Sequence, residues 1–69
     1  MSEPMPMIEV TLGEGRSPEQ LRALITSLTT ATMEAIGAPK QSIRVILREV
    51  PRTHFAAGNQ TLAERDSSS

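Results

Sequence analysis

The sequence predicts a small α/β fold: one βαβ unit, in which a helix joins two parallel strands, followed by a C-terminal hairpin-like segment. Two stretches, residues 7–12 and 42–50, alternate with the period of two that is typical of strands. Between them, apolar residues recur at spacings of three and four, which is the helical period. A chain of 69 residues without cysteine has neither a large core nor a disulfide to stabilise it. We therefore expect the unit to associate with further copies.

The first predicted strand covers residues 7–12. Its apolar face is formed by Ile8, Val10 and Leu12. Pro6 stands directly before the strand, where a residue without an N–H group is tolerated. Gly13 and Gly15 indicate a turn after it.

A helix is predicted to follow this turn. Ser17 can cap it, Pro18 suits the first helical position, and Gln20 completes a capping box. Gly37 is the expected C-terminal glycine, and Pro39 prevents the helix from continuing. One apolar stripe is formed by Leu21, Leu24, Ile25, Leu28, Thr32, Ala35 and Ile36.

The second predicted strand, residues 42–50, has bulky apolar residues on both faces. One face has Ile43, Val45 and Leu47, and the other has Arg44, Ile46, Arg48 and Val50. Such a strand is often central in a sheet or at an interface. The helical connection predicts a right-handed crossover and parallel pairing. Because two strands alone do not make a stable sheet, this pattern also indicates assembly.

The remaining segments flank a single predicted domain at residues 6–65. Residues 51–60 are expected to form a loop with a short hairpin, in which Gly58 and Asn59 take positive φ. Residues 61–65 are a short tail segment, and residues 66–69 are predicted to be a flexible tail. Residues 1–5 are either an N-terminal extension or the product of a start assigned too early, in which case Met5 is the initiator.

Composition excludes several classes of function. Seven basic and eight acidic residues leave a net charge of −1, and Phe55 is the only aromatic residue, so nucleic-acid binding is not expected. One histidine and no cysteine argue against a structural metal site, and we expect no cofactor. No apolar run is long enough to span a membrane. No secretory signal is recognisable, so the cytoplasm is the expected location.

Three polar candidates for a site are Pro6, Arg16 and Arg44. Arg16 lies at the helix entrance, the end of a βαβ unit where ligands often bind and exposed amides favour anions. Taken singly, Arg16 is better explained as a solvated turn residue, and Arg44 as a strand-edge charge or an intersubunit ion pair. Phe55 alone is a core or interface residue, and His54 is expected to be exposed. No Ser-His-Asp set, paired carboxylates or phosphate loop is present.

Taken together, these residues resemble a known family. The runs Pro6-Met7-Ile8, Leu12-Gly13-Glu14-Gly15-Arg16-Ser17, Ala38-Pro39, Ile43-Arg44-Val45-Ile46 and His54-Phe55 are similar to 4-oxalocrotonate tautomerase. Counted from the proline, the family has its turn arginine at ten residues, its strand arginine at 38 and its phenylalanine at 49. Pro6, Arg16, Arg44 and Phe55 keep all three intervals. The resemblance extends from Pro6 to Arg65 without a gap.

This resemblance implies a tautomerase-superfamily fold, in which two protomers form a four-stranded sheet and three dimers form a hexamer. It is expected to be a homohexamer, although a heterohexamer of two chain types stays open. The resemblance also implies that the free amine of Pro6 is the general base and that Arg44, from a neighbouring subunit, polarises the keto and carboxylate oxygens. Arg16 would hold the distal carboxylate, Phe55 would keep the pocket dry, and Gly13 would contribute a backbone contact. The implied substrate is a small dicarboxylate or 2-oxo acid, as in aromatic hydrocarbon catabolism.

The chemistry of such a base is physically consistent. A general base is most effective when its pKa lies near the operating pH. Burial and adjacent arginine charges disfavour the ammonium form, so the pKa of a free Pro6 amine should fall. The same arginines would stabilise the negative charge that develops on the enolate.

The chain departs from the family at its N-terminus, at position 13 and in the loop after Phe55. If residues 1–5 persist, the nitrogen of Pro6 is an amide and cannot act as a base. The glycine-rich loop after the phenylalanine appears as 56–59 (Ala-Ala-Gly-Asn), and Gly13 stands where the family often has leucine. Three hypotheses follow: an isomerase of a 2-hydroxydienoate such as 2-hydroxymuconate, a silenced assembly or binding protein, and a relative of trans-3-chloroacrylic acid dehalogenase. The last is disfavoured because Ala57 stands where that chemistry needs a carboxylate to activate water.

Overall fold

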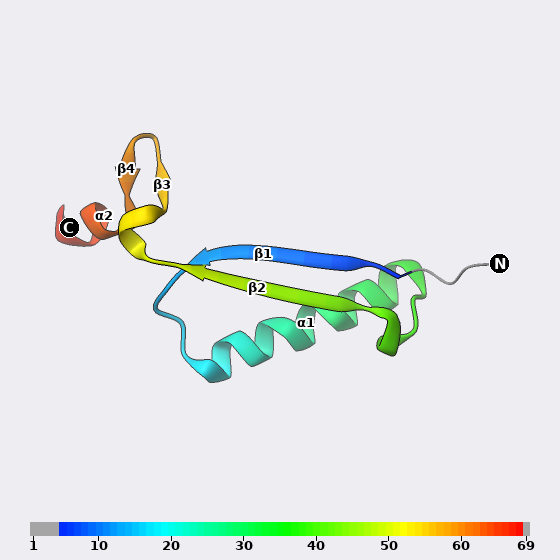
Figure 1. Ribbon diagram of the computed structural model, residues 1–69. Helices are drawn as coiled ribbons and strands as arrows, with labels where there is room; N and C mark the ends of the chain where they lie inside the picture. The colour runs from blue at the N-terminus through cyan, green and yellow to red at the C-terminus, as the bar shows by residue number, and fades with distance from the viewer. Residues whose placement is uncertain (1–4, 69) are drawn as a thin grey trace.

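The computed structural model describes residues 5–68, with side chains described for residues 5–66. Strand β1 (Met7–Gly13), helix α1 (Pro18–Ile36) and strand β2 (Arg44–Val50) form the predicted βαβ unit (Figure 1). The strands pair in parallel, from Met7 opposite Arg44 to Gly13 opposite Val50. The predicted fold class is confirmed. The second strand begins two residues later than predicted, because Lys40–Ser42 forms a 3₁₀ turn, η1.

Helix α1 begins and ends at the predicted residues. The Ser17 hydroxyl accepts from the Gln20 N–H at 3.1 Å, and the Gln20 side chain accepts from the Ser17 N–H at 2.9 Å. Pro18 occupies the first helical position. At the other end Gly37 takes a left-handed conformation (φ 69°) and donates to the Met33 carbonyl at 2.9 Å. These bonds satisfy backbone groups that a helix terminus leaves unpaired.

The two faces of the sheet differ in exposure. Helix α1 lies along one side of the strand pair (Figure 1). The apolar residues that alternate on this face are half-buried: Ile8, Val10, Leu12, Val45 and Leu47. The opposite face is open, with Met7 57% and Ile46 38% exposed. On it, Arg48 forms an ion pair with Glu9 at 2.6 Å across the strands. The second strand therefore has apolar residues on both faces, as predicted.

The C-terminal segment contains the predicted hairpin. Strands β3 (Ala56–Ala57) and β4 (Gln60–Thr61) pair antiparallel around Gly58 and Asn59, whose φ angles are 61° and 65°. Positive φ at both loop residues is the requirement of a type I′ turn. A 3₁₀ turn, η2 (Arg52–His54), connects β2 to this hairpin.

A second helix, α2 (Leu62–Ser68), replaces the tail that the sequence analysis expected after residue 60. The Thr61 hydroxyl accepts from the Glu64 N–H at 3.1 Å, and the Glu64 carboxylate accepts from the Thr61 N–H at 2.9 Å. This is a second capping box, and Thr-x-x-Glu was the sequence signal for it. The flexibility predicted for residues 66–69 stays a prediction, and Ser69 lies outside the described residues. Of the predicted extension, residues 1–4 also lie outside them, and Met5 is 65% exposed.

The described part of a single chain has almost no core. Among the described residues only Ala38 is a buried hydrophobic residue. The accessible surface is 5140 Å², against about 4200 Å² expected for a folded monomer of this mass. The radius of gyration is 15.6 Å, against about 11 Å for a compact chain of this length. No helix within residues 5–68 has both the length and the apolar content to cross a bilayer.

Candidate active site

Pro6 and Arg44 lie together at the end of the sheet where the two strands begin. The Pro6 carbonyl accepts from the Arg44 N–H at 3.0 Å, and Arg44 is the register partner of Met7. Pro6 is half-buried and Arg44 is exposed. We call Pro6 and Arg44 the base half-site. Parallel pairing produces this arrangement directly, since Arg44 and Met7 form the first rung of the ladder and Pro6 directly precedes Met7. That the Arg44 side chain acting in a given site comes from a neighbouring subunit stays a prediction.

Gly13, Arg16 and Phe55 lie at the opposite end of the sheet. Gly13 is the last residue of β1, and the exposed Arg16 follows it in the turn that leads to α1. Phe55 is half-buried, and its carbonyl accepts from the Leu62 N–H at 2.9 Å. We call Gly13, Arg16 and Phe55 the turn half-site.

The structure does not bring the two half-sites of one chain together. Strand β1 has seven residues, and a parallel strand advances about 3.3 Å per residue. The base half-site and the turn half-site are therefore separated by roughly 23 Å. A single six-carbon dicarboxylate cannot contact both ends of the same strand. A complete site with all five predicted residues requires the two ends to come from different chains.

Two residues that the sequence analysis did not select organise the turn half-site. Arg52 in η2 donates from Nη1 to the Glu14 carbonyl at 3.1 Å and from Nε to the Asp66 carboxylate at 2.8 Å. Leu62, the first residue of α2, lies over Gly13, and a Cβ added at Gly13 would come within 2.5 Å of its Cδ1. The side chain of Leu62 thus occupies space that Gly13 leaves empty. No sequence pattern pointed to Arg52, because its partners are 14 and 38 residues away.

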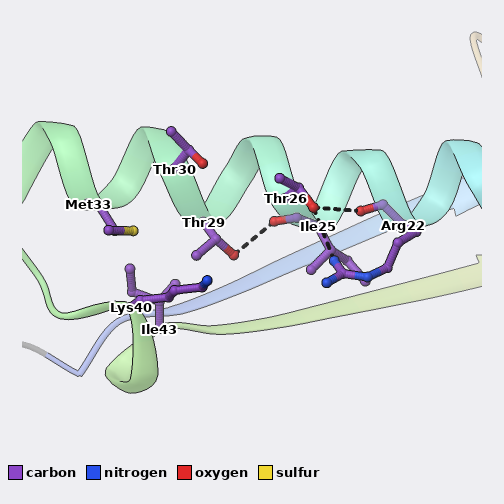
Figure 2. A pocket seen from close by; sticks show the side chains of 8 residues that line it. All are labelled: Arg22, Ile25, Thr26, Thr29, Thr30, Met33, Lys40 and Ile43. Atoms are coloured by element: carbon purple, nitrogen blue, oxygen red, sulfur yellow. Dashed lines mark hydrogen bonds between the residues drawn. The ribbon is translucent and has the colours of Figure 1, made fainter.

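A separate open groove of about 410 Å³ lies between α1 and η1 (Figure 2). It is lined by Arg22, Ile25, Thr26, Thr29, Thr30, Met33, Lys40 and Ile43. Two of its hydroxyls already donate within the helix: Thr26 to the Arg22 carbonyl at 3.2 Å and Thr29 to the Ile25 carbonyl at 2.8 Å. None of the predicted site residues lines it. Within the described residues, no group of three His, Cys, Asp or Glu side chains is placed to hold a metal ion.

Comparisons with known proteins identify the family to which the chain belongs. The sequence model of the tautomerase enzyme family matches residues 6–65. A probable tautomerase of Ralstonia nicotianae is 55% identical over 51 residues, covering 74% of this chain and 73% of the relative. A 2-hydroxymuconate tautomerase of Stutzerimonas stutzeri is 39% identical over 57 residues, covering 83% of this chain and 90% of that protein.

Two solved structures with the same fold are of 4-oxalocrotonate tautomerases. One of the isozymes from Methylibium petroleiphilum superimposes with a TM-score of 0.88 at 30% identity, covering 93% of this chain and 100% of that one. A heterohexameric 4-oxalocrotonate tautomerase from Chloroflexus aurantiacus gives a TM-score of 0.83 at 38% identity, covering 87% and 97%. The fold and the family therefore agree over nearly the whole chain.

Proposed function

The chain belongs to the 4-oxalocrotonate tautomerase family of the tautomerase superfamily, and we propose that it isomerises a 2-hydroxydienoate such as 2-hydroxymuconate to its conjugated 2-oxo form. The observation that carries the proposal is the set Pro6, Arg16, Arg44 and Phe55, which keeps the family's spacing and lies in two half-sites at the ends of one sheet. The relative from Stutzerimonas stutzeri, a 2-hydroxymuconate tautomerase, supports the choice of substrate.

We propose that the active form is a homohexamer built as a trimer of dimers. Support comes from the near absence of buried hydrophobic residues among those described, the open sheet face with exposed Met7 and Ile46, and the excess accessible surface. The separation of the half-sites adds a functional reason, because only a second chain can place a turn half-site next to the base half-site of the first. The similar Chloroflexus aurantiacus protein is a heterohexamer, so an assembly of two chain types is the other outcome to test.

In the proposed reaction, the free amine of Pro6 removes the proton from the 2-hydroxyl group of the dienol and delivers a proton to C5. The O–H bond breaks, a C5–H bond forms, and the two C=C bonds become one C=O and one C=C bond. Arg44 stabilises the negative charge that develops on the C2 oxygen, and Arg16 binds the distal carboxylate. Phe55 excludes water, and Gly13 contributes a backbone contact.

The decisive experiment compares two forms of the protein, one that starts at Met1 and one that starts at Met5. Removal of the initiator from the short form exposes Pro6 as a secondary amine, whereas in the long form its nitrogen is an amide. Intact mass establishes both termini, and ketonisation of 2-hydroxymuconate is then followed. We expect activity in the short form alone. Equal activity with the extension still attached would show that Pro6 is not the base, and no activity in either form would favour a silenced binding protein.

Substitution of the two arginines tests the rest of the site. Arg44→Ala should lower kcat about 10²- to 10³-fold, because it removes a charge that acts mainly in the transition state. Arg16→Ala should mainly raise KM, because a distal carboxylate is held similarly in the ground and transition states. Arg22→Ala is the matched control, since Arg22 bonds Thr26 within its own helix. If kcat and KM were unchanged in both Arg44→Ala and Arg16→Ala, the assignment of these arginines to the site would be refuted.

A further inference from the structure

Arg52 joins three segments at the turn half-site. It lies in η2, its Nη1 donates to the Glu14 carbonyl at 3.1 Å, and its Nε donates to Asp66 of α2 at 2.8 Å. We propose that Arg52 is a positioning residue: through Glu14 it holds the turn that presents Arg16 to the distal carboxylate of the substrate. This inference rests on the proposed function and names a residue outside the catalytic set. We call Arg52, Asp66 and the Glu14 carbonyl the Arg52 clamp.

The turn needs such a clamp because it contains a glycine in an unusual conformation. Gly15 has a φ of 128°, a region that other residues rarely adopt, and Arg16 follows it with an exposed side chain. On one side of Gly15, the Glu14 N–H donates to the Val50 carbonyl at 2.9 Å. On the other side, Ser17 is fixed as the helix cap. The Arg52 bond to the Glu14 carbonyl therefore restrains the peptide unit that directly precedes Gly15.

Helix α2 contributes two contacts to the clamp region. Asp66 binds Nε of Arg52, which leaves the planar guanidinium oriented with Nη1 toward the turn. Leu62, from the same helix, packs over Gly13 at the end of β1. Helix α2 thus makes two contacts in this region: a charged one with Arg52, which bonds the turn that contains Arg16, and an apolar one with the end of β1.

The clamp predicts a specific kinetic signature. Arg52 and Asp66 are 36% and 60% exposed, so solvent screens their ion pair and the effect of losing it should be moderate. Loss of the clamp should leave Arg16 less well ordered and thereby weaken binding of a distal carboxylate. The proton transfer at Pro6 and Arg44 should be unaffected. A general structural defect would instead affect every substrate and kcat as well.

The experiment uses the active form of the full assembly and the variants Arg52→Ala, Arg52→Lys and Asp66→Asn, with Arg22→Ala as control. KM and kcat are measured with 2-hydroxymuconate and with 2-hydroxypenta-2,4-dienoate, which lacks the distal carboxylate. We expect Arg52→Ala to raise KM three- to tenfold for the dicarboxylate only, with kcat within twofold of wild type. Arg52→Lys should raise KM for the dicarboxylate nearly as much as Arg52→Ala does, because an ammonium group lacks the guanidinium fork. Asp66→Asn, the mildest change, should shift KM in the same direction.

Amide hydrogen exchange over residues 13–17 gives a readout that does not depend on activity. Exchange in the turn should be faster in Arg52→Ala than in wild type and Arg22→Ala, with the sedimentation of the assembly unchanged. Unchanged exchange, or an equal rise in KM for both substrates, would overturn the clamp. If the wild-type protein isomerises neither substrate, the proposed function fails, and the exchange measurement alone decides whether Arg52 orders the turn.

Discussion

The contact between Gly13 and Leu62 predicts a strong coupling between two substitutions. A Cβ added at Gly13 would lie 2.5 Å from Cδ1 of Leu62, about 1 Å inside ordinary van der Waals contact. Gly13→Ala therefore requires Leu62 to move. The obstacle is the terminal methyl of a half-buried side chain, so the cost should be at the low end of the overpacking range, about 1 kcal/mol.

Leu62→Ala should also destabilise the protein when made alone. Full truncation of a buried leucine costs about 2–5 kcal/mol, and Leu62 is only half-buried, so we expect about 1–2 kcal/mol. In the double variant the alanine at position 13 enters space that Leu62 has vacated. The overpacking cost disappears and part of the cavity is filled. The double variant should then be less destabilised than the sum of the single changes by about 1 kcal/mol.

The assay is urea unfolding of the four proteins at one fixed protomer concentration, since the stability of an oligomer depends on concentration. A control cycle pairs Gly13→Ala with Leu28→Ala in the middle of α1, where the two effects should add. Additivity of Gly13→Ala and Leu62→Ala within about 0.5 kcal/mol would show that the two side chains do not share this space. The packing of α2 on β1 would then be refuted.

Two further predictions concern assembly and helix ends. Sedimentation equilibrium should show an oligomer at micromolar concentration, since the described chain has one buried hydrophobic residue; a folded monomer would contradict this. Ser17→Ala should lower the free energy of unfolding by about 1 kcal/mol, because it removes the cap of α1. Thr61→Ala should instead speed amide exchange in α2 with a smaller effect on global unfolding, and equal global effects would contradict the peripheral position of α2 (Figure 1).

Most of the fold was predictable because its signals are local. The alternation at 7–12, the capping box at Ser17 and the glycine at position 37 each act within a few residues, and the structure has β1 and α1 where these signals put them. The Gly58-Asn59 turn was predictable for the same reason. Helix α2 was missed although Thr61 and Glu64 carried a capping box, because the following serines suggested a frayed tail.

The candidate site was predictable only in part. The spacing of Pro6, Arg16, Arg44 and Phe55 identified the residues but not their grouping, which depends on the parallel register and the length of β1. Arg52 was not predictable, because its role arises where η2, the turn and α2 meet. Gly13 was recognised as a departure from the family, which often has leucine at this position. That the side chain of Leu62 fills the space beside Gly13 is visible only in three dimensions.

Because the proposed site combines half-sites from two chains, activity should depend on the oligomer, and dilution tests this dependence. Since one chain buries so little, the contacts that stabilise the proposed assembly are also those that join Pro6 of one chain to Arg16 of another. Ile46→Glu places a charge on the open sheet face, so its specific activity should fall steeply as the protein is diluted and should recover on concentration. Arg44→Ala should instead be impaired at every concentration. If specific activity stayed constant on dilution below the dissociation point of the oligomer, a single chain would contain a complete site, and the inter-chain arrangement would be wrong.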